Sequence, residues 1–509
     1  MRFLKGLFFC IIVAHANVKA TVKLSTLFTD NMVLQRNAEL RIWGWANHGE
    51  KVTLKFNGQQ QETIAKDGKW MLRLNPMKEN AEAQNLIVTG TNTITIKNVL
   101  IGDVWICAGQ SNMEWSLSKS TNGLKAIEES NNPLLRIFNV PHNPQMQPVE
   151  QVNAKWVISQ PSTTKNISAV GYWFLSSLQK DVKIPIGFIN VSYGGTPIES
   201  WLSKEALKSM PFQDKYMDAE VMKAEYDEKL EKIKPLIQKY ELLKDSARLA
   251  NLPTPPRPAE IPTEYKGTTT IYNGEIFPLL PLAVKGIAWY QGENNAYTNR
   301  AHTYEALLTK MIALWRADFQ QPQLPFIIIQ LPGHKKEQDQ PTEHSGIAML
   351  REAQLKVSQK VPYTCLVTTS DCGDLDVHYT LKESVGYRLY QAALHLAYAK
   401  KTVFTGPLYQ SYKVSGNSIV IDFAHKGSGL TINTKADEKL YGFAIAGEDK
   451  KFYWANAVIK DNKVVLSSPQ VAKPVAVRYG WADFSKKWNL FNKEGYPAST
   501  FRTDHWELK

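Results

Sequence analysis

The hydrophobic pattern changes twice along the chain and divides it into three regions. From residue 21 to about residue 100, short stretches alternate apolar and polar positions, which is typical of half-buried strands. These stretches are residues 40–45, 52–56, 70–74 and 93–96. The dipeptides Asn57-Gly58 and Asp67-Gly68 are turn signals. The pattern predicts an N-terminal β-sandwich-like domain over residues 21–100.

Between residues 101 and 400, continuous apolar runs are separated by longer helical stretches such as residues 304–315. Runs of this kind are typical of parallel strands that are covered on both faces. They occupy residues 104–108, 187–191, 286–290, 326–329 and 365–368. The alternation predicts an α/β domain with a doubly wound parallel sheet, where ligands bind beyond the carboxyl ends of the strands.

One segment, at about residues 204–265, interrupts this alternation. Residues 219–249 are rich in Lys, Glu and Leu at helical spacing, and a proline-rich connector follows at 253–262. Pro235 is expected to kink or divide the helix. We interpret the segment as a helical insertion into the α/β domain.

Beyond residue 401 the strand and turn pattern returns. The predicted strands are residues 418–423, 440–445 and 464–466. Residues 401–509 are therefore expected to form a C-terminal β region.

The first twenty residues have the features of a secretory signal sequence. Arg2 and Lys5 precede an apolar run at residues 7–14, and small residues lead to a cleavage site after Ala20. The run is too short to span a bilayer as a helix, and no later segment is a better candidate. We expect residues 1–20 to be removed and the mature protein to be secreted or periplasmic.

Composition and charge narrow the function classes. With 43% hydrophobic and 21% charged residues, the chain is expected to be globular and ordered. The formal net charge of +12 stays positive after removal of the signal, but Lys and Arg are interspersed with acids and no nucleic-acid motif is present. A positive surface for acidic glycans is therefore favoured over nucleic-acid binding.

The spacing of the cysteines and histidines does not resemble a zinc site, so we predict no metal. No other cofactor is expected. Three cysteines remain after signal removal. Cys365 and Cys372 are the simplest pair for a disulfide, but the odd count and the apolar flanks of Cys107 argue against a disulfide framework.

The stretch with the most chemical interest is residues 104–115, VWICAGQSNMEW. An apolar strand ends there at Gly109, which permits a tight exit, and Ser111 and Asn112 follow at the start of the next element. A serine at the carboxyl edge of a buried strand exposes its hydroxyl beside backbone N–H groups, which suits a nucleophile. The alternative role for Ser111 is that of a helix N-cap.

A serine nucleophile needs a base and a group that orients the base. His378 follows a predicted central strand and is the one histidine of ten with several carboxylates close upstream. Asp376 and Asp374 are the candidates for the orienting acid, and a Ser–His dyad is a third possibility. His505, next to Asp504, is a rival base, but it lies in the C-terminal β region.

Two further turns follow predicted strands of the central domain. Residues 191–201, VSYGGTPIESW, contain Gly194 and Gly195. Residues 289–294, WYQGEN, contain Gln291 and Asn294. Glycine lets a substrate approach the backbone closely, although a plain strand-exit turn would have the same form.

The GQSNM run at residues 109–113 resembles, letter for letter, the first block of the sialate O-acetylesterase family within the SGNH hydrolases. The two turns resemble the second and third blocks, and Asp376-Val377-His378 resembles the Asp-Ile-His-like run of the family. Shorter resemblances extend this likeness over nearly the whole mature chain, at residues 28–36, 272–274, 350–354, 442–447 and 501–504. Tyr379 departs from the family pattern, which usually has proline directly after the histidine. This difference affects the expected shape of the loop that carries His378.

The resemblance implies an SGNH hydrolase sheet of the flavodoxin-like type, with Ser111 as nucleophile, His378 as base and Asp376 as orienting acid. It also implies an oxyanion hole. The implied donors are the backbone N–H groups of Ser111 and Gly194 and the side-chain amide of Gln291 or Asn294. Gln291 has this role in relatives with a Gln-Gly-Glu run, whereas Asn294 matches the more general Gly-x-Asn form.

The implied activity is that of a carbohydrate esterase that removes O-acetyl groups from sialic acids through an acyl-enzyme. An acetylxylan or hemicellulose deacetylase is the alternative within this class, and a non-catalytic glycan-binding protein is the alternative outside it. Arg351 is a candidate clamp for the sialic acid carboxylate, with a structural ion pair as the plainer interpretation.

Overall fold

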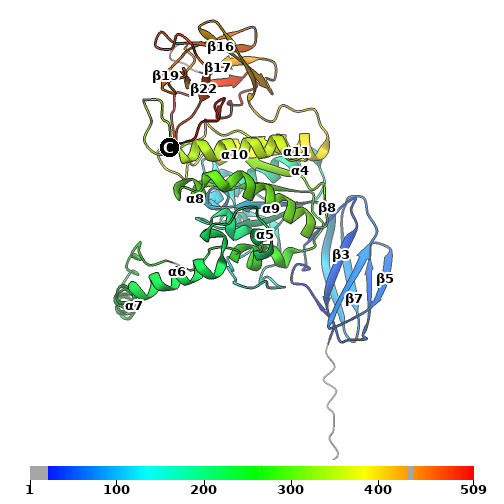
Figure 1. Cartoon of the computed structure of the whole chain (residues 1–509). Coiled ribbons are helices and arrows are strands. Elements are labelled where there is room, and N and C mark those ends of the chain that lie inside the picture. Colours follow the sequence, from blue (N-terminus) through cyan, green and yellow to red (C-terminus); the bar gives the residue numbers. More distant parts are fainter. Residues whose placement is uncertain (1–20, 251, 263, 434–438, 509) are drawn as a thin grey trace, which may run out of the picture.

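The computed structural model describes residues 21–508 apart from 251, 263 and 434–438, so the predicted signal sequence lies outside the described residues. An N-terminal β region, a central α/β region and a C-terminal β region follow one another along the chain (Figure 1). The prediction of an α/β protein with additional β regions is confirmed.

The N-terminal β region consists of short strands. They are β1 (Lys23–Leu24), β2 (Val33–Gln35), β3 (Leu40–Trp45), β4 (Lys51–Phe56), β5 (Gln59–Ile64), β6 (Lys69–Leu74) and β7 (Asn80–Thr89). β1, β3 and β6 form one sheet, while β4 pairs with β5 and β7 in another. Asn57 and Gly58 have φ values of 48° and 75°, the left-handed conformation expected of a two-residue hairpin turn between β4 and β5.

One long strand, β8 (Thr93–Gly109), joins the N-terminal region to the central sheet. Its first part pairs with β7, and its second part pairs in parallel with β11 (Ile186–Ser192) and β12 (Gly286–Tyr290). The sequence predicted separate strands at 93–96 and 104–108. They are one strand because all of its residues from Val99 onward are buried, so the chain has no exposed turn between the two regions.

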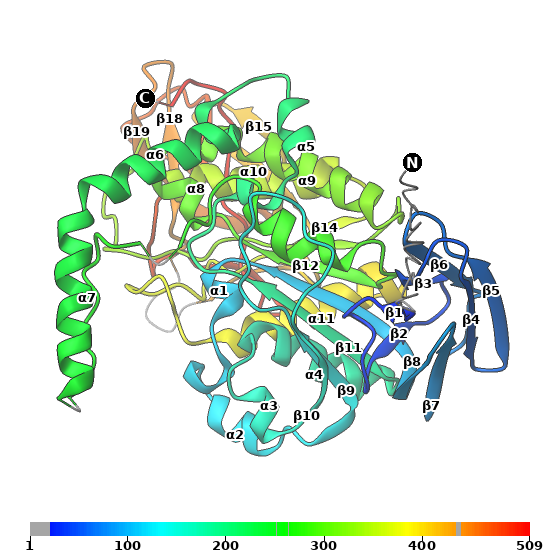
Figure 2. The same ribbon diagram turned by 90° about the horizontal axis from the view of Figure 1, so that it is seen from below.

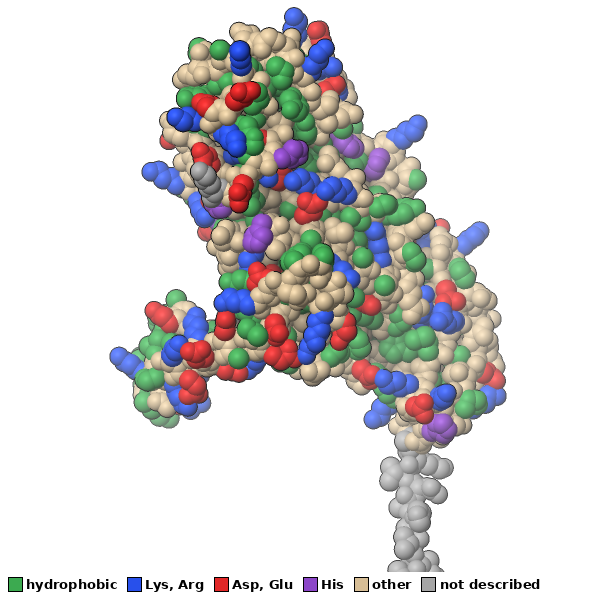
Figure 3. All heavy atoms as spheres, viewed as in Figure 1, with side chains coloured by type: hydrophobic (Ala, Val, Ile, Leu, Met, Phe, Trp, Pro, Cys, Tyr) green, Lys and Arg blue, Asp and Glu red, His purple; other side chains and the backbone are tan. Residues whose placement is uncertain are grey.

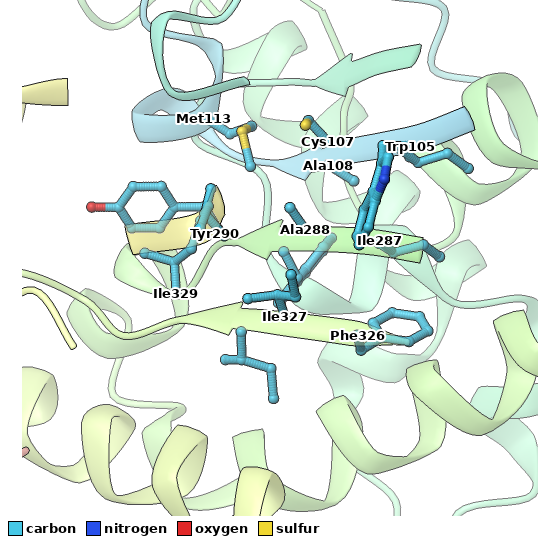
Figure 4. Close-up of a cluster of buried hydrophobic side chains, with 14 of the residues drawn as sticks. Trp105, Cys107, Ala108, Met113, Ile287, Ala288, Tyr290, Phe326, Ile327 and Ile329 are labelled. Carbon is cyan, nitrogen blue, oxygen red and sulfur yellow. The ribbon is translucent and has the colours of Figure 1, made fainter. Parts of the chain in front are cut away.

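The central sheet has the strand order β10-β9-β11-β8-β12-β13-β14. Its remaining members are β9 (Asn132–Asn139), β10 (Trp156–Ser159), β13 (Phe326–Ile329) and β14 (Thr364–Val367). Neighbouring strands from β9 to β14 are parallel, and β10 is an antiparallel edge strand. Figure 4 shows apolar side chains of β8, β12 and β13 packed together, as the continuous apolar runs predict.

Helices cover both sides of these strands. α4 (Ala169–Val182) packs with α11 (Lys382–Tyr398), and α9 (Tyr304–Asp318) packs with α10 (Gly346–Lys360). In Figure 2 the strands lie between the two helix pairs. The shorter helices are α1 (Ser111–Glu114), α2 (Gly123–Glu128), α3 (Pro161–Thr164), α5 (Lys204–Lys208) and α8 (Glu293–Tyr297).

The predicted helical insertion forms an arm that projects from the central region (Figure 1). It consists of α6 (Ala219–Lys232) and α7 (Lys234–Leu249), which are separated at Ile233. Pro235 lies in the first turn of α7, where a missing N–H is tolerated, so it divides the predicted helix rather than kinking it.

The C-terminal β region contains small sheets. Its strands are β15 (Leu408–Ser415), β16 (Ser418–Ala424), β17 (Leu430–Ile432), β18 (Phe443–Ala446), β19 (Phe452–Trp454), β20 (Asn456–Lys460), β21 (Lys463–Ser467), β22 (Ala476–Tyr479), β23 (Leu490–Asn492) and β24 (Phe501–Arg502). The predicted strands at 418–423 and 464–466 lie within β16 and β21. The prediction at 440–445 is correct only from Phe443 onward, because Gly442 has a φ of 95° and ends the extended conformation there.

Three other expectations concern cysteines, metals and membranes. Cys107, Cys365 and Cys372 are buried free thiols, so Cys365 and Cys372 are not joined. Within the described residues, no group of three or more His, Cys, Asp or Glu side chains could hold a metal ion. The described part of the chain also has no helix long and apolar enough to cross a membrane.

Candidate active site

Ser111 lies at the turn that ends β8. Gly109 has a φ of 144°, and a Cβ at this position would lie 2.0 Å from the carbonyl oxygen of Tyr290. Only glycine allows β8 and β12 to approach this closely at their ends. Gln110 is extended, and Ser111 is the first residue of α1, so the predicted strand-to-turn position of Ser111 is confirmed.

Backbone and side-chain hydrogen bonds tie the three predicted motifs together around this turn. The N–H of Tyr193 donates to Gly109 O at 2.9 Å, and the N–H of Gln110 donates to Tyr290 O at 3.0 Å. Gln110 Oε1 accepts the N–H of Gly292 at 3.1 Å. The carboxyl ends of β8, β11 and β12 therefore form one rigid edge.

Gly194 lies directly against Ser111. A Cβ at Gly194 would be 3.1 Å from Ser111 Cβ and 2.8 Å from Glu114 Oε2. Gly195, the alternative donor, has a φ of 72° and faces Lys266 Nζ instead. Of the two glycines, Gly194 is the one that adjoins the candidate nucleophile.

The N–H of Gly194 donates to Glu114 Oε2 at 2.6 Å. Glu114 Oε1 also pairs with His142 Nε2 at 3.1 Å. Burial opposes ionisation of Glu114, but the contacts with His142 and Gly194 outweigh it and hold the pKa of Glu114 below its usual value. The hydrogen bond between Glu114 and His142 also raises the pKa of His142. The Glu114 carboxylate thus accepts the Gly194 N–H.

His378 adjoins the same turn through its neighbours. Asn112 Nδ2 donates to Val377 O at 3.1 Å, which ties the residue after Ser111 to the residue before His378. The rings of Trp115 and His378 are stacked, with their centroids 5.0 Å apart. Burial lowers the pKa of His378, so the imidazole is neutral at pH 7 and can accept a proton.

Asp376 is the carboxylate that accompanies His378. Its Oδ1 lies 3.9 Å from His378 Nδ1, which is beyond hydrogen-bond distance, and accepts the His378 backbone N–H at 2.8 Å. The Asp376 side chain is 75% exposed. Asp374 accepts the N–H of Leu375 and lies 3.7 Å from Lys486, so its carboxylate pairs with these groups rather than with His378. Asp376 therefore orients the backbone of the loop more strongly than the imidazole.

This geometry makes a prediction for Asp376→Asn. We expect kcat for ester hydrolysis to fall by less than about tenfold, whereas loss of a buried triad aspartate costs about 10⁴-fold. Asp374→Asn is the matched control, and both variants would be measured by acetate release near pH 7. A thousandfold loss confined to Asp376→Asn would identify it as a triad acid.

The two candidate amide donors differ in their surroundings. Gln291 is fully buried, and its Nε2 donates to Thr196 O and Asn295 Oδ1, both at 3.0 Å. Both hydrogens of this amide are thus engaged inside the protein, which leaves Gln291 without a donor for an oxyanion. Sequence alone could not reveal this, because the acceptors come from residues 196 and 295.

Asn294 is partly exposed, and its Nδ2 donates to Gly195 O at 2.9 Å. Arg300 donates to its Oδ1 at 2.7 Å and pairs with the buried carboxylate of Glu199 at 2.9 Å. These bonds fix the orientation of the amide, and an amide nitrogen carries a second hydrogen. Of the two amides, Asn294 fits the donor role better.

A buried polar network supports the nucleophile turn from behind. Asn112 Nδ2 donates to Glu293 Oε1 at 2.5 Å, and Lys382 Nζ donates to Asn112 Oδ1. Burial lowers the pKa of Lys382 to about 7 and raises that of Glu293. Because the same amide also holds Val377, the network fixes the Ser111 turn relative to the His378 loop.

The structure separates other sequence candidates from this site. The guanidinium of Arg351 is fully buried and donates to backbone carbonyls of Leu331, Ala482 and Asp483, so it is not a substrate clamp. Asp504, the acid beside the rival base His505, forms a buried ion pair with Arg478. This carboxylate therefore has a structural contact within the C-terminal β region.

Sequence reasoning missed Glu114, His142, Glu293 and Lys382. Glu114 and Glu293 lie within the recognised motifs, so their place in the sequence could have indicated that they lie at the site. His142 and Lys382 lie outside those motifs, and only the fold brings them to the strand ends.

Comparison with known proteins identifies the class. Residues 101–239 and 270–395 match the family described as "Carbohydrate esterase, sialic acid-specific acetylesterase". A carbohydrate acetylesterase from Xanthomonas citri, known from its crystal structure, is 32% identical, with a TM-score of 0.80, and the alignment covers 96% of this chain and all of that one.

Curated sialate O-acetylesterases match over most of their length. The rat enzyme is 28% identical over an alignment of 522 positions, which covers 94% of this chain and 93% of the rat protein. The human enzyme is 27% identical, with 90% of this chain and 87% of the human protein covered. The chain belongs to the carbohydrate esterase family of sialic acid-specific acetylesterases. This membership argues against the alternative of a non-catalytic glycan-binding protein.

Proposed function

We propose that the protein removes O-acetyl groups from sialic acids through a serine acyl-enzyme. The observation that carries this proposal is the junction of the Ser111 turn with the His378 loop, through the Asn112–Val377 hydrogen bond and the Trp115–His378 stack. In a member of this esterase family, such a junction supplies a nucleophile and a base at one sheet edge.

In the proposed mechanism, Ser111 Oγ attacks the acetyl carbonyl while His378 takes the hydroxyl proton. The developing oxyanion takes over the Gly194 N–H from Glu114 and is also bound by the Ser111 N–H and the Asn294 amide. His378 then protonates the departing sugar oxygen. Water, deprotonated by His378, attacks the acetyl-serine, and His378 returns this proton to Ser111 Oγ as acetate is released.

We also infer that residues 101–400 form a doubly wound SGNH hydrolase domain. The parallel strand order supports this, since the chain extends from β8 first towards β9 and β11 and then towards β12, β13 and β14. Ligands bind such sheets where the strand order changes direction, and Ser111 lies at the end of β8.

From the sequence of residues 1–20 we propose export of the mature protein to the periplasm or medium.

The proposed substrate is tested by acetate release from O-acetylated sialic acid and from acetylated xylan, side by side. The xylan arm is needed because the Xanthomonas citri relative is described only as a carbohydrate acetylesterase. We expect a higher kcat/KM on sialic acid. Release from xylan alone would preserve the esterase mechanism and overturn the sialic acid assignment.

A further inference from the structure

The C-terminal β region contains a cavity of about 590 Å³ that the proposed mechanism does not use. It lies beside β18, β19 and β20, and the segment after β13 forms another part of its wall. The residues that concern its chemistry are Asp339, Tyr441, Trp454, Asn456, Lys487 and Trp488. A volume of this size matches pockets that hold small organic ligands.

Trp454 gives the cavity an exposed aromatic surface in a fixed orientation. Its side chain is 42% exposed, although a large apolar ring is normally covered. The indole N–H donates to Asp339 O at 2.9 Å, which connects β19 to the segment after β13. The aromatic surface is therefore held in place before any ligand binds.

The polar groups beside Trp454 suit a ligand with many hydroxyl groups. Asn456 offers amide donors and an acceptor, and the Asp339 carboxylate lies 3.5 Å from Lys487 Nζ, so their charges largely balance. Sugar rings combine apolar C–H faces with hydroxyl groups. An aromatic ring flanked by amide and charged groups matches both features.

One wall of the cavity continues in sequence into a segment that packs on the loop that carries His378. A Cβ on Gly373 would lie 2.1 Å from Gly333 O, and His334 pairs with Asp374 as an isolated β-bridge, so the segment before Asp339 packs on this loop. Lys486, beside the cavity residue Lys487, lies 3.7 Å from Asp374. Figure 3 shows a hollow between the C-terminal β region and the helical arm.

From this juxtaposition we propose that the cavity is a distal glycan subsite, which binds sugar units of the chain that carries the acetylated sugar. The proposal extends the proposed function, since it assigns an oligosaccharide-linked rather than a free sugar as the preferred substrate. Trp454 provides a platform for a sugar ring, and Asn456 and Asp339 bind its hydroxyl groups.

The test uses the full-length mature protein and Trp454→Ala. Tyr412→Ala is the matched control, because Tyr412 is 41% exposed in the same region and does not line the cavity. We expect Trp454→Ala to raise KM for O-acetylated sialic acid linked to lactose by about tenfold, a typical effect of one aromatic contact. The kcat of Trp454→Ala, and the KM of this variant for free O-acetylated sialic acid, should match those of Tyr412→Ala. Equal KM values for the linked substrate in the two variants would overturn the proposal.

A binding measurement separates this proposal from the proposed catalytic function. Calorimetric titration of Ser111→Ala with sialyl-lactose or with a xylo-oligosaccharide requires no turnover. Weaker binding of either glycan after adding Trp454→Ala supports the subsite, whichever sugar is the substrate. If neither affinity changes, the subsite assignment fails even when acetate release is normal. A Trp454→Phe variant, which keeps a ring, should retain most of the affinity.

Discussion

Ser111→Ala is expected to lower kcat for acetate release by about a thousandfold or more, as removal of the nucleophile does in other serine hydrolases. The substitution removes one oxygen at the edge of the sheet and leaves Gly109 and Gln110 unchanged. The free energy of unfolding should therefore be unchanged within about 0.5 kcal/mol. Stopped assays of acetate release, together with thermal denaturation, measure both quantities.

Ser116→Ala is the matched control for this experiment. Ser116 follows five residues later, and its hydroxyl contacts Ser118 at 3.4 Å rather than any group of the site. It should keep nearly full activity. Retention of activity in Ser111→Ala would contradict the role of the GQSNM turn and with it the acyl-enzyme mechanism.

His378→Ala is expected to lower kcat by about a thousandfold, because the serine hydroxyl then has no base. It should also change the pH profile. Burial lowers the pKa of His378 below its ordinary value of 6.5, so in the wild type the imidazole is mainly neutral at pH 6.5. The ratio kcat/KM should therefore decline only at more acidic pH, where the imidazole gains a proton. The residual activity of His378→Ala should lack this decline.

His302→Ala is a suitable control, because His302 lies in the helical turn Ala301–Thr303 after α8, outside the strand-end motifs. Its pH profile should match that of the wild type. An acidic decline that persists in His378→Ala would assign the titration to another group. His142, whose pKa Glu114 raises, would then be the first to test.

The sequence could predict the parts of this site that lie within one short segment. Ser111 follows an apolar strand and a glycine, and His378 follows the apolar run of β14, so local pattern placed both after strands. The resemblance of the GQSNM and Asp-Val-His runs to the family then singled them out as candidates. The central strands were predicted for the same reason, since a strand buried on both faces is a continuous apolar run.

Parts of the site that depend on partners from distant segments could not be predicted. The choice between Gln291 and Asn294 depends on Thr196, Asn295 and Arg300, which use or orient the two amides. The distance of 3.9 Å between Asp376 Oδ1 and His378 Nδ1 is likewise set by the conformation of the loop. The separation of two residues along the sequence does not determine it. Lys382, on α11, reaches Asn112 only because the fold brings that helix behind the turn.

The central claim is that Ser111 carries the acetyl group of a sialic acid ester during turnover. Rapid acid quenching of the wild-type enzyme with excess O-acetylated sialic acid, followed by peptide mass spectrometry, tests it directly. The account predicts an acetyl group on the peptide that contains Ser111, and none in Ser111→Ala. An enzyme that turns over this substrate without acetylation of Ser111, or with the acetyl group on another residue, would contradict it.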